Sequence, residues 1–393
     1  MHHIRERTSQ SAWARWAVPF IRNNYTRAVG IYVAAQIVAL VALAILAEWH
    51  DRDLLDRLTA WDGQWYLGLA EHGYDGLGEG FADSHGEFTP GVTPLAFFPL
   101  YPRYVWLTST IPGISTAVAA LLASWVAGVV AACGIFRIGR IVDPRPRVGL
   151  LLVALSAGAP MAITMSMAYT EAVFIAFAAW ALAFALERHW IAAGLCCLLA
   201  GFTRSTASIL IAVVVVTAMV ALWQGRDRRR ALACILLCPV GLLGYWGYVA
   251  VRTGSLTGWS EIESSGWDTR FDFGSHTIPF AVRVVATGSS VMEVGAVLCL
   301  IAAGVLVVLC ALQRLPWQLT AYAAGVFVLV VGMSGIPAGK PRFLLPAAFV
   351  LLLPVAMGLA GRRRSTMIAG AVVFVAIGAW FSAYSLTGWP YAI

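Results

Sequence analysis

The segment 61–74, with the sequence WDGQWYLGLAEHGY, carries the residue whose type and position most favour chemistry. Trp61, Trp65 and Leu69 recur at helical spacing, which predicts a short amphipathic helix of the kind that lies at a membrane surface. Asp62 falls in the first turn of this helix, where a carboxylate can take the proton of a substrate hydroxyl. An acidic residue also stabilises a helix N-terminus without any catalytic role. Asp62 is therefore the candidate general base.

Ionisable residues occur at three other places within or beside strongly apolar stretches. They are Tyr169–Glu171, Arg204 and Lys340–Arg342. Charges at membrane depth are costly and usually functional, although a long side chain can also extend to the interface without binding anything. Arginine suits a bidentate phosphate contact. An acidic loop facing fixed cations is what an enzyme acting on a lipid phosphate needs, so Arg204, Arg342 and Lys340 are candidate ligands of a phosphate.

Aromatic and acidic side chains beside these charges are candidates for substrate binding. Glu171 could orient an arginine or bind a sugar hydroxyl, and Tyr169 lies two residues before it. Trp61, Trp65 and Tyr101 could stack on sugar rings or anchor the loop that holds them. Taken alone, the segment that contains Tyr101 is equally typical of an aromatic belt at a membrane interface.

The composition indicates the solvent of the protein. Of 393 residues, 60% are hydrophobic and only 12% are charged, whereas a soluble domain carries about 25% charge. The sequence therefore predicts an all-α polytopic integral membrane protein. The net charge of +7 is typical of cytoplasmic loops rather than of nucleic-acid binding. The seven cysteines, an odd number within apolar runs, predict neither a disulfide framework nor a metal site.

Apolar stretches and charge define the expected topology. The region 191–223 is interrupted at Arg204, and two short helices there leave 18 Arg and Lys residues inside and 9 outside, against 15 and 12 for one span. About 11 spans follow, with a cytoplasmic tail at 1–27 and a single membrane domain at 28–393. Long extracytoplasmic loops are expected at about 48–113, carrying short interfacial helices, and at about 252–290. The second loop holds Glu261, Glu263, Asp268 and Asp272.

The order of these motifs resembles that of a known family. The stretches WDGQWYLGLAEHGY (61–74), AFFPLYP (96–102), YTEAVF (169–174), GFTRS (201–205) and PRFLLP (341–346) are similar, in this order, to elements of the GPI mannosyltransferase type II family, the PIG-V type. The sequence departs from the family at Thr93–Leu95, where members carry an acidic residue and a histidine, and in a glycine-rich insert at 76–91. These departures concern the acceptor more than the reaction.

The resemblance implies a membrane glycosyltransferase of the GT-C fold that uses a polyprenyl-phosphate-mannose donor and inverts the anomeric carbon. Asp62 would be the base, and Arg204, Arg342 and Lys340 would hold the donor phosphate. The partners would be this donor, a lipid or glycan acceptor and membrane lipids, with no cofactor, metal or nucleic acid. We expect a multi-pass protein of the cell membrane with an extracytoplasmic active site.

Two other functions remain open from the sequence. A transporter or flippase of a polyprenyl-linked sugar would use the same outer cations, but it predicts coupling-ion sites and internal repeats that the sequence does not display. A membrane acyltransferase would need a histidine-centred site in the membrane. The expected outer histidines, His50, His72, His85 and His276, all fall in loops.

Overall fold

The protein is an assembly of helices. A computed structural model describes residues 7–78 and 80–393, with side chains from Asn23 onward apart from residue 79. Within these residues there is no β-strand, only an isolated bridge between Phe271 and Met333. Helices satisfy their backbone hydrogen bonds internally, which is what a chain in lipid requires.

Three groups of helices build the fold. The long apolar elements are α1 (Arg7–Trp49), α5 (Thr116–Val142), α10 (Arg228–Leu237) with α11 (Val240–Thr253), α14 (Val291–Leu312), α16 (Lys340–Leu351) with α17 (Leu353–Ala360), and α18 (Arg364–Thr387). The shorter apolar helices are α6 (Pro146–Ala157), α7 (Glu171–Leu186), α8 (Trp190–Gly201), α9 (Ala207–Trp223), α13 (Thr277–Thr287) and α15 (Trp317–Gly332). The remaining elements are α2 (Leu54–Leu58), α3 (Asp62–His72), η1 (Thr93–Ala96), α4 (Leu100–Ser109), η2 (Ala162–Ser166), α12 (Gly258–Trp267) and η3 (Pro337–Gly339).

The number of helices long enough to span a membrane is smaller than the number of spans that the sequence predicts. Among the described residues, five helices are long and apolar enough to cross a membrane, with α10 and α11 together forming one of them. The pair α16 and α17, bent by 46°, raises the number to six. About 11 spans are therefore not confirmed, because several predicted stretches form helices of only 10–17 residues, shorter than the roughly 20 residues of a typical span. The predicted interruption near Arg204 is present, since α8 ends at Gly201 and α9 begins at Ala207.

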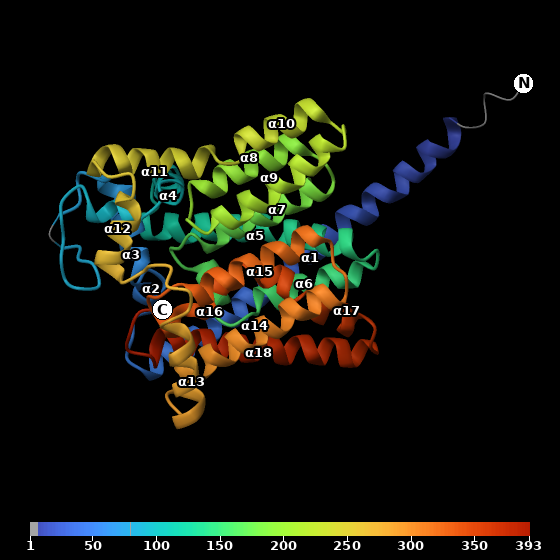
Figure 1. Cartoon of the computed structure of the whole chain (residues 1–393). Coiled ribbons are helices and arrows are strands. Elements are labelled where there is room, and N and C mark those ends of the chain that lie inside the picture. The colour runs from blue at the N-terminus through green and yellow to red at the C-terminus, as the bar shows by residue number, and fades with distance from the viewer. Residues whose placement is uncertain (1–6, 79) are drawn as a thin grey trace, which may run out of the picture.

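The apolar helices lie side by side, and the site elements gather at one end of them. In Figure 1, α2, α3, α12 and the C-terminus lie at the end of the bundle opposite the start of α1. Helix α7 packs against α5, α8, α9 and α16, and most of its residues are buried. A helix that is apolar all round belongs in a core. The N-terminus of α7, which begins at Glu171, is thus fixed within the protein.

One face of helix α3 packs against other parts of the protein. Trp65 is only 7% exposed and stacks on Phe97 with ring centroids 4.9 Å apart. It also contacts Phe81 and Trp267. Tyr66 and other residues of the same face are buried against α4 and α5. The apolar spacing predicted the helix correctly, and residues of the second loop and of the segment after α3 cover its Trp65 face. Its position at the membrane surface stays a prediction.

The predicted N-terminal tail lies partly outside the described residues, which begin at residue 7. From Arg7 the chain is already helical, and this helix continues to Trp49. Helix structure therefore covers most of the stretch 1–27, while the side of the membrane on which it lies stays a prediction.

Candidate functional site

Asp62 is held at the first position of α3 by an unusual backbone conformation. The preceding residue, Trp61, has φ +51° and ψ −116°, a region that costs a non-glycine residue about 1–3 kcal/mol and persists only where the surroundings enforce it. Two contacts do so: the Ala168 amide donates to the Leu58 carbonyl at 2.9 Å, and the Tyr169 hydroxyl donates to the Ala60 carbonyl at 3.1 Å. The turn before Asp62 is therefore tied to the segment that leads into Glu171.

Four charged side chains from distant parts of the sequence meet here. The Arg342 Nη2 donates to the Asp62 Oδ2 at 2.8 Å, and the Arg342 Nε lies 3.5 Å from the Glu171 Oε1. Arg204 forms an ion pair with the same Glu171 oxygen and donates to the Thr170 Oγ1 at 3.2 Å. Residues 62 and 342 are 280 positions apart. The fold, rather than local spacing, therefore creates the cluster Asp62, Glu171, Arg204 and Arg342, which we call the charged site.

The four side chains of the charged site differ in how far they are exposed to solvent. The side chain of Glu171 is 0% exposed, that of Arg342 6% and that of Arg204 13%, whereas that of Asp62 is 30% exposed. Buried ion pairs are strongly coupled, and the loss of one partner leaves an uncompensated charge. The arginines are thus fixed in the protein, and Asp62 is the most accessible of the four.

Polar atoms of the charged site are left without hydrogen bonds. The Arg342 Nε and Nη1 and the Glu171 Oε2 are buried and have no hydrogen-bond partner among the described residues. A guanidinium group offers five N–H donors in a planar fork, and buried polar groups are nearly always hydrogen-bonded in native proteins. Unused donors on a buried arginine indicate a place for an anionic ligand.

Aromatic rings fix the orientation of the arginines. The guanidinium carbon of Arg342 lies 5.1 Å from the ring centroid of Tyr169 and 4.7 Å from that of Phe343, and the guanidinium carbon of Arg204 lies 5.9 Å from the Phe343 centroid. Cation–π contacts of this kind are worth about 0.5–2 kcal/mol. The Tyr169 ring therefore contacts the guanidinium group of Arg342, while its hydroxyl holds the turn before Asp62.

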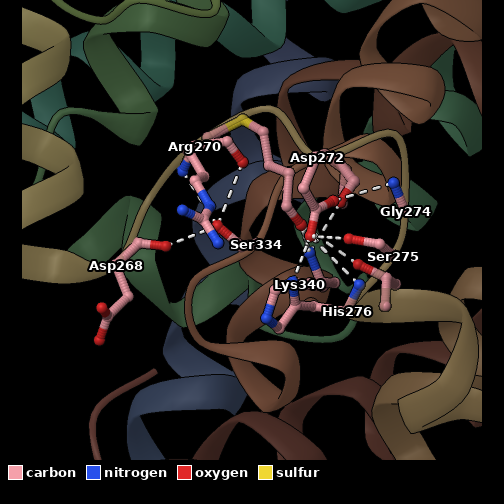
Figure 2. A network of polar contacts seen from close by, with 11 residues as sticks. Asp268, Arg270, Asp272, Gly274, Ser275, His276, Ser334 and Lys340 are labelled. Atoms are coloured by element: carbon pink, nitrogen blue, oxygen red, sulfur yellow. Dashed lines mark hydrogen bonds and ion pairs between the residues drawn. The ribbon is translucent and has the colours of Figure 1, made fainter.

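Lys340 lies outside the charged site. Its ammonium group donates to the carbonyls of Val330 and Met333, at 2.8 and 2.7 Å, near the C-terminal end of α15. Figure 2 shows it beside Asp272, Ser275 and His276. Only Arg342 of the predicted basic pair reaches the charged site. Whether Lys340 holds a phosphate stays a prediction, but its hydrogen bonds are those of a residue that caps a helix C-terminus.

The predicted aromatic residues are differently placed. Trp65 is enclosed by other aromatic rings, and Tyr101 is 0% exposed with its hydroxyl bonded to Ser124 and to the Ala120 carbonyl. Both anchor the first loop. Trp61 remains partly exposed next to Asp62, with the Arg57 guanidinium 5.8 Å from its ring. Among the three, Trp61 is the one available to a ligand.

Histidines and metal-ligating groups do not gather at the charged site. His85 pairs with Asp268 at 3.3 Å, His72 lies 3.6 Å from Glu71, and all four of these residues are exposed. Within 7–78 and 80–393, no group of three or more His, Cys, Asp or Glu side chains is arranged to hold a metal ion. A histidine-centred acyltransferase site therefore finds no counterpart in the described part of the chain.

Sequence reasoning assigned no role to Tyr66 and Glu263. The Tyr66 hydroxyl hydrogen-bonds with Thr170, which extends the polar contacts of Arg204. Glu263 belongs to α12 in the second loop, and the charges of Asp62 and Arg204 act on its carboxyl. A signal was available for Glu263, because Trp259, Glu263 and Trp267 recur every four residues and so share one helix face.

Two kinds of solved structure are similar to this chain. The Archaeoglobus fulgidus oligosaccharyltransferase in complex with zinc and sulfate matches with a TM-score of 0.52 and 15% identity, over 90% of this chain and 53% of that chain. ArnT from Cupriavidus metallidurans in the apo state matches with a TM-score of 0.50 and 14% identity, over 96% and 75%. The chain has a GT-C fold. It spans about half the length of the oligosaccharyltransferase chain.

At these identities the likeness concerns the fold alone. No protein-family model and no curated protein sequence matches this chain. The polytopic all-α membrane architecture expected from the sequence is confirmed, whereas the resemblance to the PIG-V type receives no support beyond the GT-C fold.

Proposed function

We propose that the protein is a membrane glycosyltransferase that transfers mannose from a polyprenyl-phosphate-mannose donor to a hydroxyl of a lipid or glycan acceptor. The reaction takes place at the extracytoplasmic face of the cell membrane and inverts the anomeric carbon. Asp62 acts as general base, and Arg342 and Arg204 bind the donor phosphate. The mannose and the polyprenyl carrier rest on the motif resemblance, and sugar transfer is also consistent with the shared fold of an oligosaccharyltransferase.

The observation that carries this proposal is the pairing of Asp62 with Arg342. The two side chains form a hydrogen bond at 2.8 Å, while Arg342 keeps two further N–H groups, Nε and Nη1, without hydrogen bonds. A lipid phosphate supplies the oxygens that these donors lack. A partly exposed carboxylate next to a phosphate-binding arginine is the minimum that transfer from a phosphate-linked sugar requires.

Binding of the donor would change the role of Asp62. In the ligand-free protein Arg342 neutralises Asp62 and Glu171. A phosphate that takes the Nη donors of Arg342 releases Asp62, whose carboxylate is then free to accept a proton. The base is thus freed at the step at which the donor is already in place.

The steps of the transfer reaction follow from the positions of the charged side chains. The acceptor oxygen attacks C1 of the sugar while Asp62 takes its proton, and the bond from C1 to the phosphate oxygen breaks. Attack from the face opposite the phosphate inverts C1. Negative charge grows on the leaving phosphate, where Arg342 and Arg204 stabilise it by electrostatic contacts already present before the reaction. A positioned base contributes about 10²–10⁴-fold to the rate.

Sugar transfer by the purified protein tests the proposal. Full-length protein in nanodiscs is incubated with radiolabelled polyprenyl-phosphate-mannose and a panel of lipid and glycan acceptors, and labelled product is separated by chromatography. We expect transfer that releases polyprenyl phosphate in equal amount. Absence of transfer to every acceptor, together with movement of the labelled donor across sealed vesicles, would contradict the enzyme and favour a flippase.

A further inference from the structure

The second loop brings another carboxyl group to the charged site. Helix α12 is fixed to the first loop by two tryptophans: the Trp259 Nε1 donates to the Ala96 carbonyl at 3.2 Å, and Trp267 contacts Trp65 and Phe97 with centroids 5.9 and 5.6 Å apart. Glu263 lies four residues from each tryptophan and therefore on the same face of the helix. Its side chain is directed towards the elements that carry Asp62.

Glu263 has no polar partner of its own. Its carboxyl makes no hydrogen bond or ion pair with any described residue, yet it is only partly accessible. The charges that act on it are those of Asp62 and Arg204. A carboxyl group on the helix face that packs against the first loop, and bonded to no other described residue, is available to a ligand and is not a member of a structural ion pair.

We propose that Glu263 binds the transferred sugar through hydrogen bonds with the sugar hydroxyls. This inference rests on the proposed function. Asp62 takes the proton of the hydroxyl whose oxygen attacks C1, and Arg204 helps to bind the phosphate. The sugar lies between the attacking oxygen and the phosphate. A carboxyl group whose pKa is affected by both Asp62 and Arg204 therefore lies against the sugar.

The protonation state follows from the surroundings of Glu263. Burial, with a smaller contribution from the Asp62 carboxylate, raises its pKa from 4.5 to about 8, although the charge of Arg204 opposes the rise. At pH 7 most of the protein therefore carries the protonated form. A neutral acid beside a donor phosphate avoids repulsion between two anions. Since only the protonated form donates a hydrogen bond, donor affinity falls as the pH rises through about 8.

The other charged groups near α12 are engaged elsewhere. Glu261, on the same helix, accepts hydrogen bonds from Ser255 and Thr257. On α11, Arg252 pairs with Asp75. Asp83, beside Gly266, accepts from the backbone amides of His85 and Glu87, and His85 pairs with Asp268. Besides burial, the charged groups that affect the pKa of Glu263 are thus Asp62 and Arg204.

The test compares Glu263→Ala, Glu263→Gln and the control Glu261→Gln with the wild type in the nanodisc transfer assay between pH 6 and 9. We expect Glu263→Ala to raise the donor KM about tenfold at pH 7, the worth of one or two hydrogen bonds, with the acceptor KM unchanged. Glu263→Gln, which keeps a neutral donor and acceptor, should raise the donor KM less than threefold and abolish the increase in donor KM above pH 8. Glu261→Gln should retain the wild-type pH profile.

If the wild type transfers the sugar, the proposed function stands, and three results would then contradict the role of Glu263. They are a Glu263→Ala variant with wild-type donor KM, a Glu263→Gln variant as impaired as Glu263→Ala at every pH, and an alkaline increase in donor KM that persists in Glu263→Gln. Loss of transfer in the wild type itself would instead refute the proposed function. Circular dichroism of each variant in detergent checks that the helices are retained.

Discussion

Two clusters of charge meet the start of α16, one through Arg342 and the other through Lys340, and they differ in how completely their hydrogen bonds are made. In the charged site, Arg342 and Glu171 retain three buried polar atoms without hydrogen bonds. In the second cluster, shown in Figure 2, the Asp272 carboxylate accepts from Gly274, Ser275 and His276, and Lys340 donates to two carbonyls. Neither Asp272 nor Lys340 has a buried polar atom left over.

The difference separates a ligand site from a structural one. A saturated cluster, in which the buried polar atoms all have hydrogen-bond partners, has little to offer a ligand, because its charged groups are already engaged within the protein. An unsaturated cluster costs stability until something completes it. Residue types alone do not reveal this: an acid and a base occur in both. A variant that changes one cluster leaves the other cluster intact, so the unchanged cluster is the control.

The largest expected effect is that of Asp62→Asn on turnover. The amide has the shape of the carboxylate but cannot accept the proton of the acceptor hydroxyl, so transfer should fall by about 10²-fold or more. Donor affinity should persist, because the arginines hold the phosphate. Rates and donor affinities are measured in nanodiscs, with Asp272→Asn as the matched variant of the saturated cluster. Transfer by Asp62→Asn near the wild-type rate would remove Asp62 from the role of base.

A smaller effect is expected for Lys340→Met, and on stability rather than turnover. Methionine fills the same space but leaves the Val330 and Met333 carbonyls without the ammonium donor. An unsatisfied buried acceptor costs about 1–3 kcal/mol. The variant should therefore unfold at a lower temperature in detergent while its transfer rate stays within a few-fold of the wild type. A large rise in donor KM with an unchanged melting temperature would restore Lys340 as a phosphate ligand.

The smallest expected effect is the pH dependence of Asp272→Asn. Although burial opposes ionisation, hydrogen bonds led by that of His276 lower the pKa of Asp272 from 3.8 to about 2. A carboxylate with a lowered pKa stabilises the fold above about pH 4, and this contribution is lost as the pH falls towards 2. The melting temperature of the variant should lie slightly below that of the wild type at pH 7, and the gap should close between pH 4 and 2. A gap that is independent of pH would contradict this assignment.

The sequence predicted the kind of fold and several site positions, but not their packing. Periodicity located the helix that starts at Asp62 and the break at Arg204, because both are local properties of the chain. It could not show that Trp65 packs within an aromatic cluster rather than at a membrane surface, since the rings that enclose it come from residues 81, 88, 97 and 267.

Lys340 and Arg342 illustrate the same limit at the scale of one helix turn. The two cations are separated by a single proline and are indistinguishable by pattern. At the start of α16 one guanidinium points to Asp62 and the ammonium group points to the end of α15. Glu263 was overlooked as one acid among several in a loop, although its spacing from two tryptophans gave its direction. Contacts between distant segments, rather than local spacing, decide these cases.

The central claim is that the unsaturated cluster is the site of the donor, and donor binding measures it directly. Thermal unfolding of the wild type, Arg342→Gln and Lys340→Met is recorded in detergent with increasing polyprenyl-phosphate-mannose. A ligand that binds the folded state raises the melting temperature, and the rise increases with the ligand concentration and with its affinity. We predict a rise for the wild type and Lys340→Met, and little or none for Arg342→Gln. A full rise for Arg342→Gln, with none for Lys340→Met, would contradict the claim and place the donor at the saturated cluster.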